Sequence, residues 1–179
     1  GTSDGDGKDF DVQYRKEFNN TPSHFIRALF RRSNSISDKE SFIRESLREP
    51  NGLIILDTNI QNTRRIQTVV QVDFERPLAN EGKWEWGLKS NISNSSDAYD
   101  YLSPDSSIWD NGLYVPVNPV KNSFAFDYRE EVHSAYSTFG RKWGVWGVQS
   151  GLRVEQVFTF ATVTGQSPFE NNYFSLYPS

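Results

Sequence analysis

The residues best suited to chemistry in this 179-residue chain are its two histidines, His24 and His133. His24 follows Ser23 in a turn-like segment, and His133 lies in a strand-like segment without an obvious serine or cysteine partner, so neither matches a Ser-His-Asp hydrolase. The chain has no cysteine and no Gly-x-Ser-x-Gly motif, which excludes thiol chemistry and gives no sign of a nucleophile elbow. The 23 acidic residues could include a glycosidase pair, but most of them alternate with apolar residues along strand-like segments. We therefore expect no enzymatic activity.

The first nine residues, GTSDGDGKD, place Asp4, Asp6 and Asp9 close together in sequence. Calcium prefers oxygen ligands at such short spacing. The distal glutamate of an EF-hand loop is missing, however, and a strand-like segment follows where a helix should begin. This stretch therefore favours a flexible loop over a metal site, and the sequence predicts no cofactor.

The element that organises the chain is the stretch from Lys142 to Phe160, KWGVWGVQSGLRVEQVFTF. Trp146, Val148, Leu152 and Val154 fall on one side, with Ser150 as the polar member between them. The other side has Gln149, Gly151, Arg153 and Glu155. Because side chains alternate between the two faces of a β-strand, this pattern predicts a strand with one apolar and one polar face. A strand that crosses a bilayer at a tilt needs about 9–11 residues and shows the same alternation.

Similar alternation predicts an all-β, antiparallel up-and-down meander of about seven long strands. The predicted strands are residues 10–18, 24–32, 64–76, 83–93, 123–139, 142–160 and 171–179. They are joined by short turns at 19–23, 77–82 and 140–142 and by long loops at 33–63, 94–122 and 161–170. In the first long loop, Ser37 and Glu40 could begin a short helix, but we favour a hairpin that turns at Pro50-Asn51-Gly52.

Short turns at one end and long loops at the other are typical of an outer-membrane barrel. Single-chain bacterial barrels have even strand numbers, so seven strands predict part of a larger transmembrane β-barrel. Aromatic residues near the short turns, among them Phe25 and Tyr136, would form an interfacial girdle. The residues that we expect to face lipid are Ile66, Val70, Val72, Phe74, Trp84, Trp86, Leu88, Trp146, Val148, Leu152 and Val154. Those that we expect to face the lumen are Arg15, Arg27, Arg31, Gln71, Asp73, Glu75, Lys89, Gln149, Arg153 and Glu155.

The C-terminal half carries the most specific motifs. The stretch EEVHSAYSTFGRKWGVWGVQSGLRVEQ, followed by FENNYFSLYPS, resembles the TonB-dependent-receptor-like outer-membrane β-barrel family. The matching positions are Glu131–Tyr136, Gly151-Leu152-Arg153 with Glu155, and Phe169–Ser179. Fainter similarity extends back through FERPLANEGKWEWGLKS to FDVQYRKEF, so the resemblance covers most of the chain.

This resemblance implies a barrel segment in the outer membrane of a Gram-negative bacterium that serves substrate uptake. Residues 1–179 would form a partial barrel domain, and the remaining strands, the plug domain and the segment that contacts a TonB-type energising protein would lie outside it. The outer-loop aromatics Tyr99, Tyr101, Trp109 and Tyr114 could stack on a small ligand, such as a sugar, siderophore or peptide, or pack the loop against itself.

The alternative is a soluble extracellular β-sandwich that serves as a carbohydrate-binding module, since such domains also have about seven aromatic-rich strands. Its apolar strand faces would meet in a dry core, whereas those of a barrel would face lipid. The net charge of −4 gives no indication of nucleic-acid binding.

Overall fold

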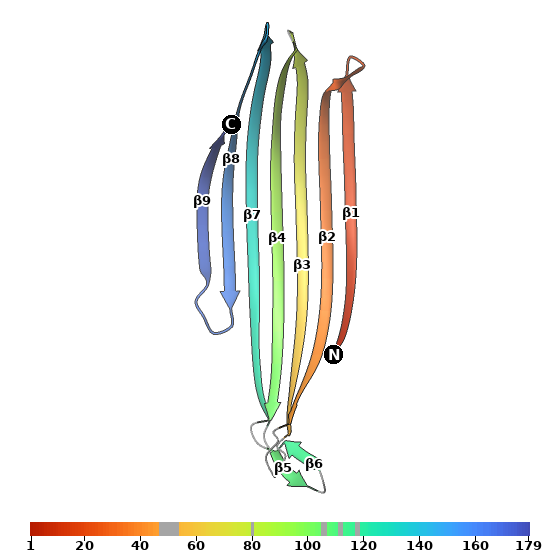
Figure 1. Ribbon diagram of the computed structural model, residues 1–179, viewed down its shortest axis with the longest axis vertical. Helices are drawn as coiled ribbons and strands as arrows, with labels where there is room; N and C mark the ends of the chain where they lie inside the picture. The colour runs from red at the N-terminus through yellow and green to blue at the C-terminus, as the bar shows by residue number, and fades with distance from the viewer. Residues whose placement is uncertain (47–53, 80, 105–106, 111–112, 117–118) are drawn as a thin grey trace.

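The chain forms one antiparallel sheet of seven long strands (Figure 1). The computed structural model describes residues 1–46, 54–79, 81–104, 107–110, 113–116 and 119–179. The sheet has the order β1-β2-β3-β4-β7-β8-β9, so neighbours in sequence are neighbours in space except where the β5–β6 hairpin intervenes. The strands of the sheet are β1 (Thr2–Phe18), β2 (Thr21–Ser46), β3 (Ile54–Leu78), β4 (Gly82–Pro104), β7 (Pro119–Trp143), β8 (Trp146–Val163) and β9 (Phe169–Pro178). The small hairpin pairs β5 (Ser107–Asp110) with β6 (Leu113–Pro116).

The two ends of the sheet differ. At the turn end, β1–β2, β3–β4 and β7–β8 are joined by the short segments 19–20, 79–81 and 144–145. At the loop end lie the connections β2–β3, β4–β7 and β8–β9, and the β5–β6 hairpin extends beyond the sheet there (Figure 1). The predicted meander of seven long strands is therefore confirmed. The predicted loop 161–170 is shorter than expected, because β8 continues to Val163 and β9 begins at Phe169.

The strands extend much further toward the loop end than the alternation predicted. Residues 1–9 are not a loop, because β1 pairs with β2 from Thr2, which lies opposite Glu40. Asp4 and Asp6 therefore point to one face of β1 and Asp9 to the other. Within the described residues, no three acidic, histidine or cysteine side chains cluster in a way that could hold a metal ion.

The predicted loops 33–63 and 94–122 are also largely strand. The pairs from Ser33↔Gln67 to Ser46↔Ile54 continue the β2–β3 ladder, which confirms the hairpin and contradicts a helix over the described residues up to Ser46. The turn residues 50–52 themselves lie outside the described residues. These extensions mix polar and apolar residues on both faces, so their period-two signal is weak although their backbones pair fully.

The predicted turn at 140–142 is wrong. The β7–β8 ladder continues to the pair Trp143↔Trp146, and the chain reverses at Gly144 and Val145. Gly144 has a φ of +59°, a conformation that glycine adopts at no steric cost. The organising strand therefore begins at Trp146 rather than Lys142.

The sheet forms a single layer. Among the described residues, Val157 is the one buried apolar side chain, with an exposed fraction of 3%. A β-sandwich would instead bury its apolar strand faces between two sheets. The described strands thus contradict the sandwich alternative and leave the apolar face of the sheet uncovered. The described residues include no helix long and apolar enough to cross a membrane.

Candidate functional site

The register sorts the predicted site residues cleanly between the two faces of the sheet. In the rows Val72↔Leu88↔Ala135↔Val154 and Phe74↔Trp86, apolar residues lie opposite one another across the strands. We call this side the Leu88 face. It carries every residue that the sequence assigned to lipid: Ile66, Val70, Val72, Phe74, Trp84, Trp86, Leu88, Trp146, Val148, Leu152 and Val154.

The opposite side, which we call the Asp73 face, carries every residue that the sequence assigned to the lumen. These residues are Arg15, Arg27, Arg31, Gln71, Asp73, Glu75, Lys89, Gln149, Arg153 and Glu155. Phe25 and Tyr136 lie on this face too, so they cannot belong to a girdle on the Leu88 face. The Phe25 ring instead lies 3.9 Å from the Arg15 guanidinium.

Asp73 is the centre of a polar network on its face, and it is only 6% exposed. Arg27 from β2 donates to its carboxylate at 2.7 Å, and Gln71 donates from two residues away at 2.9 Å. The Tyr136 hydroxyl on β7 donates at 2.9 Å and reaches Asp73 across β4. The Tyr136 ring crosses β4 at Gly87, which lies directly opposite Tyr136 in the ladder and offers no side chain to obstruct it. Three strands are thereby tied together through one carboxylate.

Other charged residues on the Asp73 face are paired locally. Arg31 donates to Asp11 on the neighbouring strand at 2.7 Å, and Arg153 forms an ion pair with Glu155. These pairs are half-exposed, so each contributes little stability by itself. Together they give the face a hydrated surface of mixed charge.

The aromatic residues at the loop end also gather on the Asp73 face. The Tyr99 ring stacks on Phe124 of the neighbouring strand, with centroids 4.7 Å apart and an angle of 15° between the rings. The Tyr99 hydroxyl accepts a hydrogen bond from Gln61 at 2.8 Å. Phe126 and Tyr128, further along β7, stack with centroids 6.2 Å apart. With Tyr101, which is 36% exposed, they form what we call the mouth patch: Tyr99, Tyr101, Phe124, Phe126 and Tyr128.

The mouth patch includes only part of the predicted set. Tyr99 and Tyr101 belong to it, but they lie on β4 rather than on a loop. Trp109 and Tyr114 lie opposite each other in the β5–β6 hairpin, and their side chains lie outside what the structure describes. Sequence reasoning did not select Phe124, Phe126 and Tyr128 as site residues, although their spacing by two was a visible signal.

The two histidines differ in their surroundings. His24 packs between Phe18 and Phe74, with ring centroids 4.9 and 5.8 Å away. His133 has a serine partner after all, which corrects the sequence analysis: its Nδ1 lies 3.0 Å from Ser90 Oγ, and its Nε2 lies 3.3 Å from Glu131. In the Ser-His-Asp triad the carboxylate holds Nδ1 and the serine meets Nε2, so this arrangement is reversed. It lies on the Leu88 face, at the edge of an open hollow whose other walls are mainly apolar.

Comparisons with known proteins agree on the fold. Residues 16–179 match the family model described as the outer membrane protein beta-barrel family. The ferric citrate transporter FecA in its unliganded form superposes with a TM-score of 0.57 at 13% identity, over 97% of this chain and 24% of that one. BauA, the ferric preacinetobactin receptor from Acinetobacter baumannii, gives a TM-score of 0.51 at 13% identity, over 98% of this chain and 28% of that one. The chain therefore spans about a quarter of the length of these two structures, and no curated protein matches it.

Proposed function

Because this chain belongs to the outer membrane protein beta-barrel family, we propose that it supplies part of the wall of a receptor barrel that takes up a small ligand. The observation that carries the proposal is the division of one continuous sheet into the Leu88 face and the Asp73 face. A barrel wall needs an apolar outer surface against lipid and a polar inner surface toward the lumen. The residues that the sequence assigned to lipid and to lumen would then have those roles.

The domain would be completed by strands outside residues 1–179. In the described sheet, β1 and β9 are edge strands that pair on one side only. Backbone groups left unpaired in hydrocarbon cost several kcal/mol each, so both edges need partners in a membrane. A plug domain would fill the lumen against the Asp73 face, and a TonB-type protein would energise transport from the turn end.

The mouth patch would provide the first contacts for the ligand. Its rings lie on the lumen side near the long connections, and Phe124 is 48% exposed. Aromatic faces can stack on sugars, on the rings of siderophores and on peptide side chains. The interpretation that these residues pack against one another also has support, since Tyr99 and Phe124 already stack. The two interpretations differ in whether removal of the rings changes ligand affinity.

The test uses the full-length protein purified from outer membranes in mild detergent. A closed barrel resists SDS until it is boiled, so the protein should migrate differently in cold and boiled samples. Tryptophan fluorescence is then followed during titration with ferric citrate, a ferric catecholate siderophore and an oligosaccharide. We expect at least one of them to bind and the double variant Tyr99→Ala/Phe124→Ala to weaken that binding about tenfold.

The matched control is Phe42→Ala, which removes a ring at the same end of the sheet but from the Leu88 face. It should leave the affinity unchanged. Unaltered affinity in the double variant with an intact gel shift would refute the ligand-binding role of the patch. If the unmodified protein migrated identically in cold and boiled samples, the proposal of a closed barrel would be refuted.

A further inference from the structure

The Asp73 face changes in character along its strands. Toward the turn end its charged side chains are paired, as they are around Asp73. From the row in which Val69 lies opposite Asn91, β3 and β4 carry mainly amide and hydroxyl groups on this face up to the mouth patch. We call this set the amide–hydroxyl track: Gln61, Thr63, Gln67, Asn91, Ser93 and Ser95. Ser95 of the track lies opposite Tyr128, so the track and the mouth patch lie side by side.

Hydrogen bonds between neighbouring strands hold the track in place. Gln67 on β3 donates to the Asn91 side-chain oxygen on β4 at 3.1 Å. The Thr63 hydroxyl donates to the Asp97 carboxylate at 2.6 Å. An amide group has two N–H donors and an acceptor oxygen, and a hydroxyl that donates keeps its own lone pairs. The track therefore presents both donors and acceptors in an arrangement that the strands keep fixed.

Charged groups are few along the same stretch. Among the described side chains that β3, β4 and β7 place on this face from the Asn91 row to the loop end, they are Arg65, Asp97 and Glu130. One guanidinium and two carboxylates give this stretch a net charge of −1. A bound anion needs arginine or lysine side chains around it, and carboxylates beside it weaken its binding. The stretch is therefore poorly suited to an anionic ligand such as ferric citrate.

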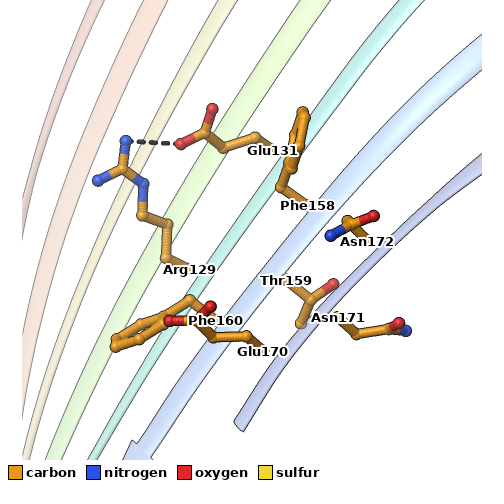
Figure 2. Close-up of a pocket in the computed structure, with 8 residues that line it drawn as sticks. All are labelled: Arg129, Glu131, Phe158, Thr159, Phe160, Glu170, Asn171 and Asn172. Atoms are coloured by element: carbon orange, nitrogen blue, oxygen red, sulfur yellow. Dashed lines mark ion pairs between the residues drawn. The ribbon is translucent and has the colours of Figure 1, made fainter. Parts of the chain in front are cut away.

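Among the described residues, most of the charge at this end of the sheet lies on the other face. Figure 2 shows the Leu88 face at the same level, where Arg129 pairs with Glu131 at 2.6 Å and Glu170 lines the same hollow. Arg64 and Asp127 belong to the Leu88 face too. The mainly neutral character of the track is therefore a property of one face and not of these strands as a whole.

The pairing of the backbone argues against a peptide ligand. Along the track, β3 pairs with β2 and β4, and β4 pairs with β3 and β7. Extended peptides are bound largely through main-chain hydrogen bonds to an unpaired strand edge. Because the backbone of the track is already paired on both sides, only its side chains can hold a ligand.

A pyranose ring combines two features that this surface matches. Its C–H face packs on aromatic rings, whose faces carry the negative part of their quadrupole, and its hydroxyls both donate and accept hydrogen bonds. We propose that the mouth patch and the track together bind an uncharged oligosaccharide, with its rings against the exposed Tyr101 and Phe124 and its hydroxyls on the track. This assignment depends on the proposed function, which turns the Asp73 face toward the lumen.

The experiment measures ligand affinity of the full-length protein in mild detergent by isothermal titration calorimetry. The probes are linear neutral oligosaccharides of glucose, mannose, xylose and N-acetylglucosamine, together with oligogalacturonate, ferric citrate and a peptide with blocked termini. We expect at least one neutral oligosaccharide to bind, with an affinity that stays constant between about 0.05 and about 0.5 M salt, because an uncharged ligand has no charge to screen. Gln67→Met/Asn91→Leu, which replaces two amides with apolar groups of similar size, should weaken this binding about tenfold.

The matched control is Asn62→Leu/Asn94→Leu, which removes one amide from each of the same two strands but from the Leu88 face. It should leave the affinity unchanged. The oligosaccharide assignment would be overturned if no neutral oligosaccharide bound, if an anionic probe or the peptide bound more tightly, or if both double variants had equal effects. Binding of ferric citrate alone, weakened by Tyr99→Ala/Phe124→Ala, would overturn it while the proposed function stands. Identical migration of cold and boiled samples would instead refute the barrel.

Discussion

Gly87 is the position at which the wall of the sheet is most sensitive to a single methyl group. A Cβ atom at this position would lie 2.7 Å from Cζ and 2.8 Å from the hydroxyl oxygen of Tyr136. A Cβ atom essentially never lies this close to an atom to which it is not bonded, so in Gly87→Ala the ring must move. Moving it breaks the 2.9 Å hydrogen bond from Tyr136 to Asp73, which is nearly inaccessible to water.

The expected cost follows from three contributions. Overpacking of a tight site costs about 1–3 kcal/mol, and loss of a hydrogen bond to a charged group costs about 1.5–3 kcal/mol. Replacing a strand glycine with alanine returns about 0.5–1 kcal/mol of chain entropy. Because Asp73 keeps its bonds from Arg27 and Gln71, the lower halves of these ranges apply. We expect a loss of about 2–3 kcal/mol in the free energy of unfolding.

The assay is equilibrium unfolding of the full-length protein in detergent, with urea as denaturant and tryptophan fluorescence as readout. Gly87→Ala, Tyr136→Ala and the double variant form a cycle that isolates their coupling. Gly140→Ala is the control, because its Cβ would lie on the same face at 3.9 Å or more from any neighbour. It should change stability by less than about 0.5 kcal/mol.

The double-mutant cycle tests whether the clash with Tyr136 causes the loss of stability. If Tyr136 causes the clash, Gly87→Ala should cost nothing, or stabilise slightly, once the ring is absent. An equal cost of Gly87→Ala with and without Tyr136 would show that the ring over Gly87 is not the cause. Tyr136→Phe separates the hydroxyl from the ring, and it should lose only the hydrogen-bond contribution.

Three other variants test the faces and the ends of the sheet. Leu88→Lys should cost about 2–4 kcal/mol of unfolding free energy if this face meets lipid, whereas Ser134→Lys on the Asp73 face should cost much less; equal costs would contradict the assignment. The Ser123 hydroxyl donates to Asp100 at 2.5 Å and holds the pKa of that carboxyl below its ordinary value. The stabilising effect of this hydrogen bond is therefore complete above the pKa of Asp100 in the unfolded chain. It disappears as the pH falls through the lower pKa of Asp100 in the folded protein. Hydrogen exchange at the loop end should rise in that acidic window, and Asp100→Asn should abolish the change. Gly144→Ala places a Cβ at a φ of +59° and should cost about 1–2 kcal/mol in urea unfolding, and no loss would argue against the turn.

The faces of the central sheet could be predicted because alternation there is strict. From Trp146 to Glu155, the side chains that were predicted to share a face of the strand do share one in the structure. The extent of the strands could not be predicted in the same way. At the loop end, a row such as Arg64↔Ser96 on one face and Arg65↔Ser95 on the other is polar on both sides. Water on both surfaces removes the selection for alternation, while the backbone ladder continues unchanged.

The contacts of the candidate sites depended on register, which the sequence did not define. Ser90 and His133 are 43 positions apart and meet because β4 and β7 align Ser90 with His133. Tyr136 and Asp73 are 63 positions apart and meet only because Gly87 leaves the path between them open. Without the lengths of the β3–β4 and β4–β7 connections, neither pair can be derived from periodicity.

The length of the strands has a consequence for how far the sheet extends beyond the membrane. β2, β3 and β7 contain 25 or 26 residues each, of which crossing the hydrocarbon requires about 9–11. At about 3.3 Å per residue, roughly 45 Å of each strand remains outside the hydrocarbon. Because its backbone is paired, this part is a continuous sheet rather than a set of separate loops. A wall of paired strands therefore continues beyond the hydrocarbon, and its rim is the part of the sheet farthest from the turn end.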